Sequence, residues 1–169
     1  MLEFSRRRIA IAAAAIAAGF AATCHAAGTN IDACQLISAA RASKILGTKI
    51  TPHAVNTSAA GAMCRFAGSG IGDGFMLIAA HVHYSNAATE VARREKEALS
   101  DTPPGIPVPS FSNIKGLGDA AYLAKTSAYF QLHVLAHGSV IVINRNVAAS
   151  TKSVEQAKQL ARVALTQLK

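Results

Sequence analysis

The sequence contains no tryptophan, only nine aspartates and glutamates, and no run of lysines or arginines after residue 26. A nucleic-acid-binding surface needs basic residues clustered on one face, so the 17 scattered basic residues argue against that class. The few carboxylates leave little material for the acid pair of a glycoside hydrolase. We therefore expect no nucleic-acid partner and no glycosidase chemistry.

Several catalytic and cofactor motifs are also absent. There is no C-x-x-C redox pair and no G-x-S-x-G nucleophile elbow. The glycine-rich stretch 68–74 lacks the lysine and the following helix of a phosphate-binding loop, and we expect it to be a turn. The sequence thus predicts a protein that is not an enzyme and carries no cofactor.

The N-terminus has the three-part pattern of an export signal. Three arginines at positions 6–8 precede an apolar run over residues 9–22, and a cleavage zone follows up to Ala26. The run is shorter than the roughly 20 apolar residues of a membrane span. We expect residues 1–26 to be a signal peptide, cleaved after Ala26 or one residue later, and residues 27–169 to be a single globular domain.

Three alternatives to this export route stay open. The arginines after Ser5 are similar to a twin-arginine signal, which exports folded chains. Cys24 is a candidate lipoprotein cysteine, although Thr23 stands where such signals usually have a small residue. The segment is alternatively a retained N-terminal anchor. If it is cleaved, we expect membrane association only if Cys24 is lipidated.

Loss of the signal peptide changes both the cysteine count and the charge of the chain. Cys34 and Cys64 remain as an even pair, and two cysteines in an oxidising compartment most simply form a disulfide. The net charge falls from +8 to +6, because the segment carries three arginines and one glutamate. A mildly basic protein of this kind favours anionic surfaces, such as membrane headgroups or acidic polysaccharide.

The mature chain predicts three helices and about six strands. Helices are expected at residues 39–46, 86–99 and 153–168, with Ser38, Asn86 and Ser153 as N-terminal caps. Strands are expected at 49–55, 63–67, 75–85, 120–124, 128–136 and 139–146. Pro52 is typical of an edge strand, and His137-Gly138 of a hairpin turn. The stretch 101–112 holds four of the five prolines and is expected to be a loop.

The order of these elements, α-β-β-β-α-β-β-β-α, predicts the fold class. Hairpin-linked strands give a mostly antiparallel sheet, so we expect an α+β domain. In the strand at 75–85, Met76 and Ile78 alternate with Leu77 and thus point to the opposite face. Gln156 completes a capping box with Ser153, and the last helix carries an apolar stripe that we expect to pack on the sheet.

Three short motifs follow one another along the mature chain. Residues 32–38 read Asp-Ala-Cys-Gln-Leu-Ile-Ser and lead to Leu46-Gly47, Cys64-Arg65-Phe66 comes next, and residues 116–122 read Gly-Leu-Gly-Asp-Ala-Ala-Tyr. In order and spacing they resemble a family of small exported bacterial proteins and lipoproteins of unknown function. The family patterns are D-x-C-x-L-[LI]-[ST], C-[RTK]-[FY] and G-[LIV]-G-D-x-A-[YF]. The likeness covers nearly the whole mature chain.

This resemblance implies a disulfide between the two matched cysteines and a compact domain similar to the PsbP-like fold. It implies no reaction, because the family has no general assigned activity. Many relatives are lipoproteins, and the poor lipidation sequence before Cys24 departs from that pattern. We interpret Asp119, in the third motif, as a residue whose side chain satisfies backbone N–H groups of a turn.

Four histidines are the one group with metal-binding chemistry. His81 and His83 are two residues apart in one expected strand, and His133 and His137 are four apart in another, so each pair shares a face. If the two strands were neighbours, three or four imidazoles could meet at Zn or Cu. The alternative is a set of ordinary polar residues on a partly solvated sheet.

These features predict a periplasmic or secreted binding or interaction protein without catalysis. We expect its partner to be an envelope protein or a small ligand, contacted through a face of the sheet or through the proline-rich loop. The second hypothesis is metal binding through the four histidines.

Overall fold

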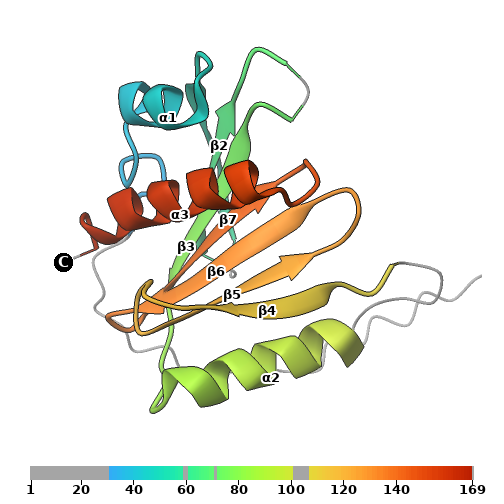
Figure 1. Ribbon diagram of the computed structural model, residues 1–169. Coiled ribbons are helices and arrows are strands. Elements are labelled where there is room, and N and C mark those ends of the chain that lie inside the picture. Colours follow the sequence, from blue (N-terminus) through green and yellow to red (C-terminus); the bar gives the residue numbers. More distant parts are fainter. Residues whose placement is uncertain (1–30, 59–60, 71, 101–106, 169) are drawn as a thin grey trace, which may run out of the picture.

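Seven strands form one antiparallel sheet in the computed structural model, which describes residues 31–58, 61–70, 72–100 and 107–168. The strands are β1 (Thr51–Ser58), β2 (Gly61–Ala67), β3 (Phe75–His81), β4 (Ser110–Ile114), β5 (Ala120–Lys125), β6 (Phe130–Ala136) and β7 (Ser139–Arg145). Their order across the sheet is β1-β2-β3-β7-β6-β5-β4, so β3 and β7 lie side by side although they are distant in sequence (Figure 1). The predicted signal peptide, residues 1–26, lies outside the described residues.

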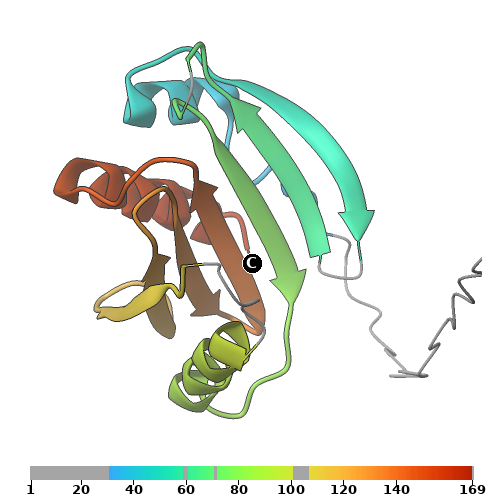
Figure 2. The same ribbon diagram turned by 90° about the vertical axis from the view of Figure 1, so that its right-hand side faces the viewer.

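The described residues form three helices, which are distributed over the two faces of this sheet. They are α1 (Ala39–Leu46), α2 (Ala87–Ser100) and α3 (Thr151–Leu165). The sheet is curved, with α1 and α3 on one side of it and α2 at the end formed by β4 and β5 (Figures 1 and 2). The predicted α+β class is confirmed. Within the described ranges, no helix is long and apolar enough to cross a membrane.

The main core lies between α3 and the sheet. The predicted apolar stripe of α3 supplies Ala157, Leu160, Ala161 and Ala164, all fully buried. Alternate residues of the strands face them, and these include Phe66, Leu77, Leu132, Val134, Ile141 and Ile143. A smaller cluster on the other face joins Val91 of α2 to Tyr122 and Leu135. This division fixes which side of the sheet every strand residue faces.

The sequence-based prediction of six strands is wrong by one, because β4 was expected to be loop. β4 follows Pro107 and Pro109 and pairs along its length with β5, Phe111 lying opposite Ala124. Prolines are strong signs of a loop, whereas a five-residue strand carries little periodic signal of its own. Residues 110–114 therefore form a strand because they pair with β5, which is a tertiary effect.

The predicted caps hold for two helices and fail for the third. The Ser38 side chain accepts a hydrogen bond from the Arg41 N–H, and Gly47 ends α1 in the left-handed region with φ +74°. Asn86 caps α2 by accepting from the N–H groups of Ala88 and Thr89. The third helix begins three residues earlier than predicted, because Ser150 is its N-cap.

The capping box of α3 pairs two serines and does not involve Gln156. The Ser150 side chain accepts from the Ser153 N–H, and the Ser153 hydroxyl accepts from the Ser150 N–H. Gln156 instead reaches α1, where its Nε2 donates to the carbonyl of Ile45 at 3.1 Å. A carbonyl at the C-terminal end of a helix lacks an intrahelical partner, so Gln156 joins the two helices.

The strand boundaries also differ in detail from the prediction. β1 ends at Ser58 and β2 begins at Gly61, so both strands extend further toward each other than the expected ranges 49–55 and 63–67. β3 ends at His81, before residue 85. β1 is an edge strand, as Pro52 predicts. The hairpin turn between β6 and β7 is confirmed, since His137 and Gly138 both have positive φ, 51° and 67°.

The disulfide between Cys34 and Cys64 is present, with a Cα–Cα distance of 5.0 Å. It joins the turn before α1 to β2, across 30 residues of sequence. Cys64 is fully buried in the main core. The bond therefore fastens the N-terminal part of the described chain to the sheet.

Candidate functional site

The structure does not bring the four histidines together. His81, at the end of β3, alternates with the core residue Ala79 and so lies on the α3 side of the sheet. His133, in β6, stacks on Tyr122 and so lies on the α2 side. His83 follows the end of β3, and His137 occupies the exposed hairpin turn. Among the described residues no group of three or more His, Cys, Asp or Glu could hold a metal ion.

The hypothesis of a four-histidine metal site is therefore wrong for this fold. Its assumption was that the two strands are neighbours in a suitable register. β7 lies between β3 and β6, and His81 and His133 face opposite sides. The Ser139 hydroxyl, which lies 3.2 Å from His81 Nδ1, is no accessible nucleophile either, because Ser139 is only 3% exposed.

Asp119 has the structural role predicted for it, although it serves a different turn. Its Oδ2 accepts a hydrogen bond from the backbone N–H of His137 at 3.1 Å, in the β6–β7 turn. The same oxygen accepts from the Tyr84 hydroxyl at 2.8 Å. Burial raises the pKa of Tyr84, and the hydrogen bond to Asp119 raises it further. These bonds fasten the segment after β3 to the hairpin.

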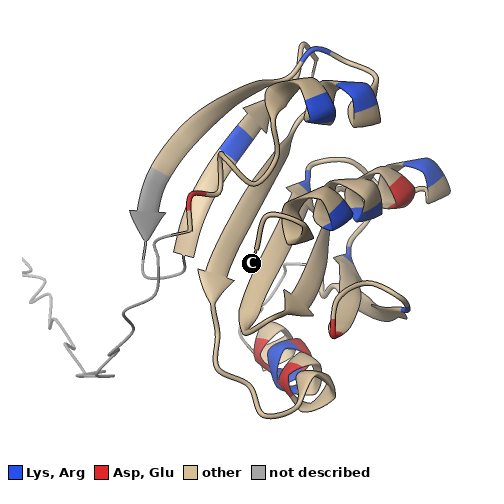
Figure 3. Ribbon diagram, turned by 90° about the vertical axis from the view of Figure 1, so that its left-hand side faces the viewer, with Lys and Arg blue, Asp and Glu red and all other residues tan. Residues whose placement is uncertain are grey.

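Charged side chains are spread over several elements of the described part of the chain. α1 carries Arg41 and Lys44, α3 carries both signs, and α2 mixes arginines with glutamates (Figure 3). On α2, Arg93 forms ion pairs with Glu90 and Glu97, and Arg94 forms one with Glu90. The hydrogen bond from Arg93 is the main reason why the pKa of Glu90 lies below its usual value. The charges on the surface of α2 thus largely neutralise one another.

We call the α2 side of β1, β2, β3 and β7 the open face. α2 packs mainly on β5, at the far end of the same side. Cross-strand register places the side chains of the open face in two rows. One row contains four polar residues and one apolar residue, Met76. Its members are His53, Arg65, Met76, Asn144 and, in the adjoining β6, Gln131. The neighbouring row is apolar and holds Val55, Met63, Ile78 and Val142.

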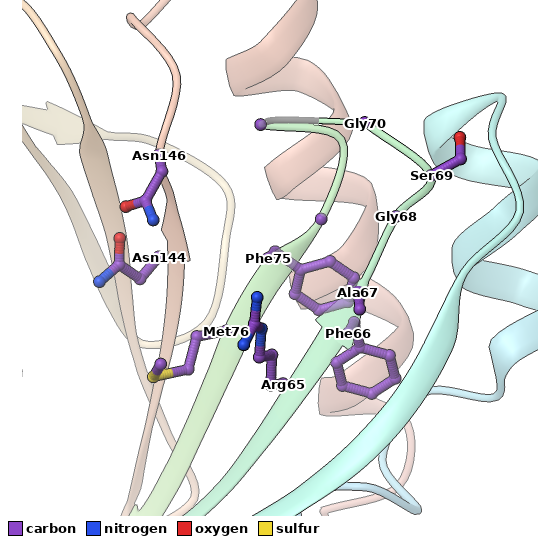
Figure 4. A pocket seen from close by; sticks show the side chains of 12 residues that line it. Arg65, Phe66, Ala67, Gly68, Ser69, Gly70, Phe75, Met76, Asn144 and Asn146 are labelled. Atoms are coloured by element: carbon purple, nitrogen blue, oxygen red, sulfur yellow. The ribbon is translucent and has the colours of Figure 1, made fainter.

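A cavity of about 760 Å³ lies at one end of the open face. It is bounded by the end of β2, the turn residues 68–70, 72 and 74, the start of β3 and the end of β7. Figure 4 shows Arg65 on the β2 side and Asn144 and Asn146 on the β7 side, with Met76 between them. Its volume falls within the range of roughly 300–1,000 Å³ typical of sites for small ligands.

Two polar groups that line this cavity, the Arg65 guanidinium and Asn144 Oδ1, have no partner among the described residues. Arg65 is exposed, and in the described part of the chain it forms no ion pair or side-chain hydrogen bond. The Oδ1 atom of Asn144 is buried and has no hydrogen-bond partner. A buried acceptor left unpaired costs about 1–3 kcal/mol. An arrangement of this kind needs an explanation in the function or the fold.

Glycines give the wall of the cavity its shape. A side chain at Gly74 would meet the carbonyl oxygen of Phe66 at 2.2 Å, and Gly72, with φ +82°, would meet Val147 at 2.5 Å. Beneath the turn, the buried Arg145 donates from Nη2 to the carbonyl of Gly72 at 3.2 Å and from Nη1 to Gln156 at 2.9 Å. Burial lowers the pKa of Arg145, and the nearby Asp73 counteracts this effect.

Sequence reasoning missed Arg65, Asn144 and Asn146 as site residues. The alternation of β2 places Arg65 opposite in direction to Cys64, which the sequence could have indicated. The asparagines meet Arg65 only because β3 pairs with β7, with Met76 opposite Asn144. That pairing joins strands that are distant in the sequence, so no local sequence motif predicts it.

Comparison with known proteins adds little to this description. No family model matches the chain, and no curated protein matches it. The chain is similar to a solved structure, the crystal structure of a GTP binding regulator from Thermotoga maritima. The two share 8% identity over 76% of this chain and 87% of the other, with a TM-score of 0.38. At that score the likeness carries no argument about function.

Proposed function

We propose that the protein is an exported binding protein without catalysis, periplasmic or secreted, that takes up a ligand on its open face. The observation that carries this proposal is the cavity of about 760 Å³ at the end of that face, with the unpaired Arg65 and Asn144 in its wall. Its likeness in motifs to small exported bacterial proteins of unknown function supports the compartment. The Cys34–Cys64 disulfide is consistent with it, because such bonds persist in oxidising compartments.

The composition of the cavity favours binding over catalysis. General acid–base chemistry needs two ionisable groups positioned at the reacting atoms. Arg65 is the one ionisable side chain among the described residues that line the cavity. An arginine remains protonated at physiological pH and is suited to holding an anion.

Export is tested by expressing the full chain in a Gram-negative bacterium and determining the mass of the protein in each cell fraction. We expect periplasmic or secreted protein beginning at residue 27 or 28. A lipid-modified Cys24 at the N-terminus would show anchoring instead. The double variant Arg6→Lys/Arg7→Lys keeps the positive charge, so loss of its export would indicate the twin-arginine route. Unprocessed protein in the cytoplasm would contradict the proposal.

Binding is tested by NMR with isotope-labelled, oxidised residues 27–169. The small-molecule fraction of a bacterial envelope extract is added, and backbone amide shifts are followed. We expect the changes to gather at residues 65–76 and 144–146. Arg41→Ala, on the surface of α1, serves as the control variant and should respond as the original chain does. Absence of shifts in this region, or conversion of an added compound, would contradict the proposal.

A further inference from the structure

We propose that the cavity on the open face binds a hydroxylated carboxylate, the chemistry of a sugar acid. This inference rests on the proposed binding function and adds the class of ligand. It follows from three properties of the cavity wall: one unpaired cation, one unpaired acceptor and an apolar strip between them. Each property favours a different group on the ligand.

The cation is Arg65, and it favours an anionic group on the ligand. The guanidinium is planar and presents two parallel N–H donors, which match the two oxygens of a carboxylate. No acidic side chain is found among the described residues that line the cavity. The nearest carboxylate of the turn, that of Asp73, accepts a hydrogen bond from Ser69 at 3.5 Å and so stays with the turn. Arg65 is therefore free to pair with an anion from outside.

The acceptor is Asn144 Oδ1, and it favours a hydrogen-bond donor on the ligand. A carboxylate offers no donor at neutral pH, so a simple anion would satisfy Arg65 and leave this oxygen unpaired. Oδ1 itself is buried, but the Asn144 side chain is only partly buried as a whole. The proposed binding therefore includes a rotation of the amide that brings this oxygen to the cavity when the ligand binds. A ligand hydroxyl would then donate to Oδ1, and the exposed amide of Asn146 lies beside it (Figure 4).

The strip between these groups is apolar. Met76 lies opposite both Arg65 and Asn144 in the cross-strand register, and so separates the cation from the amide. Its flexible thioether adapts to irregular apolar surfaces. A sugar acid carries a carboxylate at one end, hydroxyls further along and a C–H face between them. That order of groups matches the order Arg65, Met76, Asn144.

The probes are D-glucuronate, D-glucose and inorganic phosphate, titrated into the labelled, oxidised residues 27–169. We expect glucuronate to shift amides at 65–76 and 144–146, and glucose at equal concentration to cause far smaller changes. Arg65→Ala should weaken glucuronate binding by about tenfold or more, because it removes a charge-assisted pair. Arg65→Lys should keep part of the affinity, Asn144→Ala should lose part of it, and Arg41→Ala should have no effect.

Circular dichroism and melting temperature verify that each variant folds. Phosphate that binds as tightly as glucuronate, with no effect of Asn144→Ala, would overturn the inference, since an anion site alone would explain the data. If envelope extract shifts the cavity amides and glucuronate does not, the class of ligand is wrong and the proposed function stands. If neither shifts them, both proposals fail.

Discussion

At the scale of single residues, Asp119 connects two segments through one oxygen atom. Asp119→Ala removes the acceptor of the Tyr84 hydroxyl and of the His137 N–H. We expect the free energy of unfolding to fall by about 1–2 kcal/mol. Asp119→Asn should retain most of the stability, because an amide oxygen accepts both bonds. Urea unfolding followed by circular dichroism measures the difference, and equal losses in the two variants would contradict the hydrogen-bonding role.

The surroundings of His133 strongly affect its protonation. Burial, and secondarily the positive charge of Arg94, lowers its pKa from 6.5 to about 4. Its Nε2 lies 3.1 Å from Gln131 Oε1, whereas its buried Nδ1 has no hydrogen-bond partner. The imidazole is therefore neutral in the folded protein, where it stacks on Tyr122.

This pKa predicts a pH dependence of stability with a definite sign. In the unfolded chain His133 binds a proton as the pH falls below 6.5, whereas in the folded chain it stays neutral down to about pH 4. The folded state therefore loses stability relative to the unfolded state as the pH falls through this window. The loss attributable to His133 is on the order of 3 kcal/mol. His133→Phe keeps the ring stack, so the variant should lose less stability than the original chain between pH 7 and pH 4. Parallel unfolding curves at these pH values test this, and identical losses would show that His133 is not responsible.

At the scale of elements, the start of α3 offers a clear test of the structure against the sequence-based prediction. Ser150→Ala removes the acceptor of the Ser153 N–H and should lower the free energy of unfolding by about 1 kcal/mol. Thr151→Ala, at the exposed next position, is the matched control and should be nearly neutral. If Ser153 were the N-cap, as the sequence alone predicts, Ser150→Ala would have little effect.

This element also shows why the sequence predicts helices well and their ends less well. The stripe that buries Leu160 and Ala164 is set by 3.6-residue periodicity, which a single sequence displays. Ser150 and Ser153 are both good caps, and the pattern favoured Ser153 because Gln156 follows it at capping-box spacing. In the structure Gln156 bonds to Ile45 and Arg145, both from distant segments. Such tertiary contacts leave no trace in local sequence.

At the scale of the whole molecule, the same limit explains which part of the candidate site was predicted. Alternation along β3 gives the face of Met76 correctly, and two cysteines give the disulfide. The neighbours of β3 depend on which strands pair, and β7 is inserted between β3 and β6 from the far end of the chain. That one insertion separates His81 from His133 and brings Asn144 to the row that contains Arg65. This strand order therefore excludes the four-histidine metal site and forms the cavity at which we propose that a ligand binds.

The Cys34–Cys64 disulfide contributes to the stability of the whole fold. Closing a loop across 30 residues stabilises the native state by about 3–4 kcal/mol in the chain-entropy model. We expect Cys34→Ala/Cys64→Ala to lose stability of this order under oxidising conditions. A reductant should lower the melting temperature of the original chain and leave that of the double variant unchanged. Equal melting temperatures of the oxidised chain and the variant would show that the bond contributes nothing.

The same experiment separates stability from binding. Cys64 points into the main core, whereas its neighbour Arg65 points to the open face. The disulfide therefore lies on the opposite side of β2 from the cavity and makes no contact with a ligand there. We expect the double variant to bind glucuronate with unchanged affinity at temperatures where it is fully folded, measured by the same NMR titration. A large loss of affinity in the folded variant would mean that the bond also fixes the position of β2 beneath the cavity.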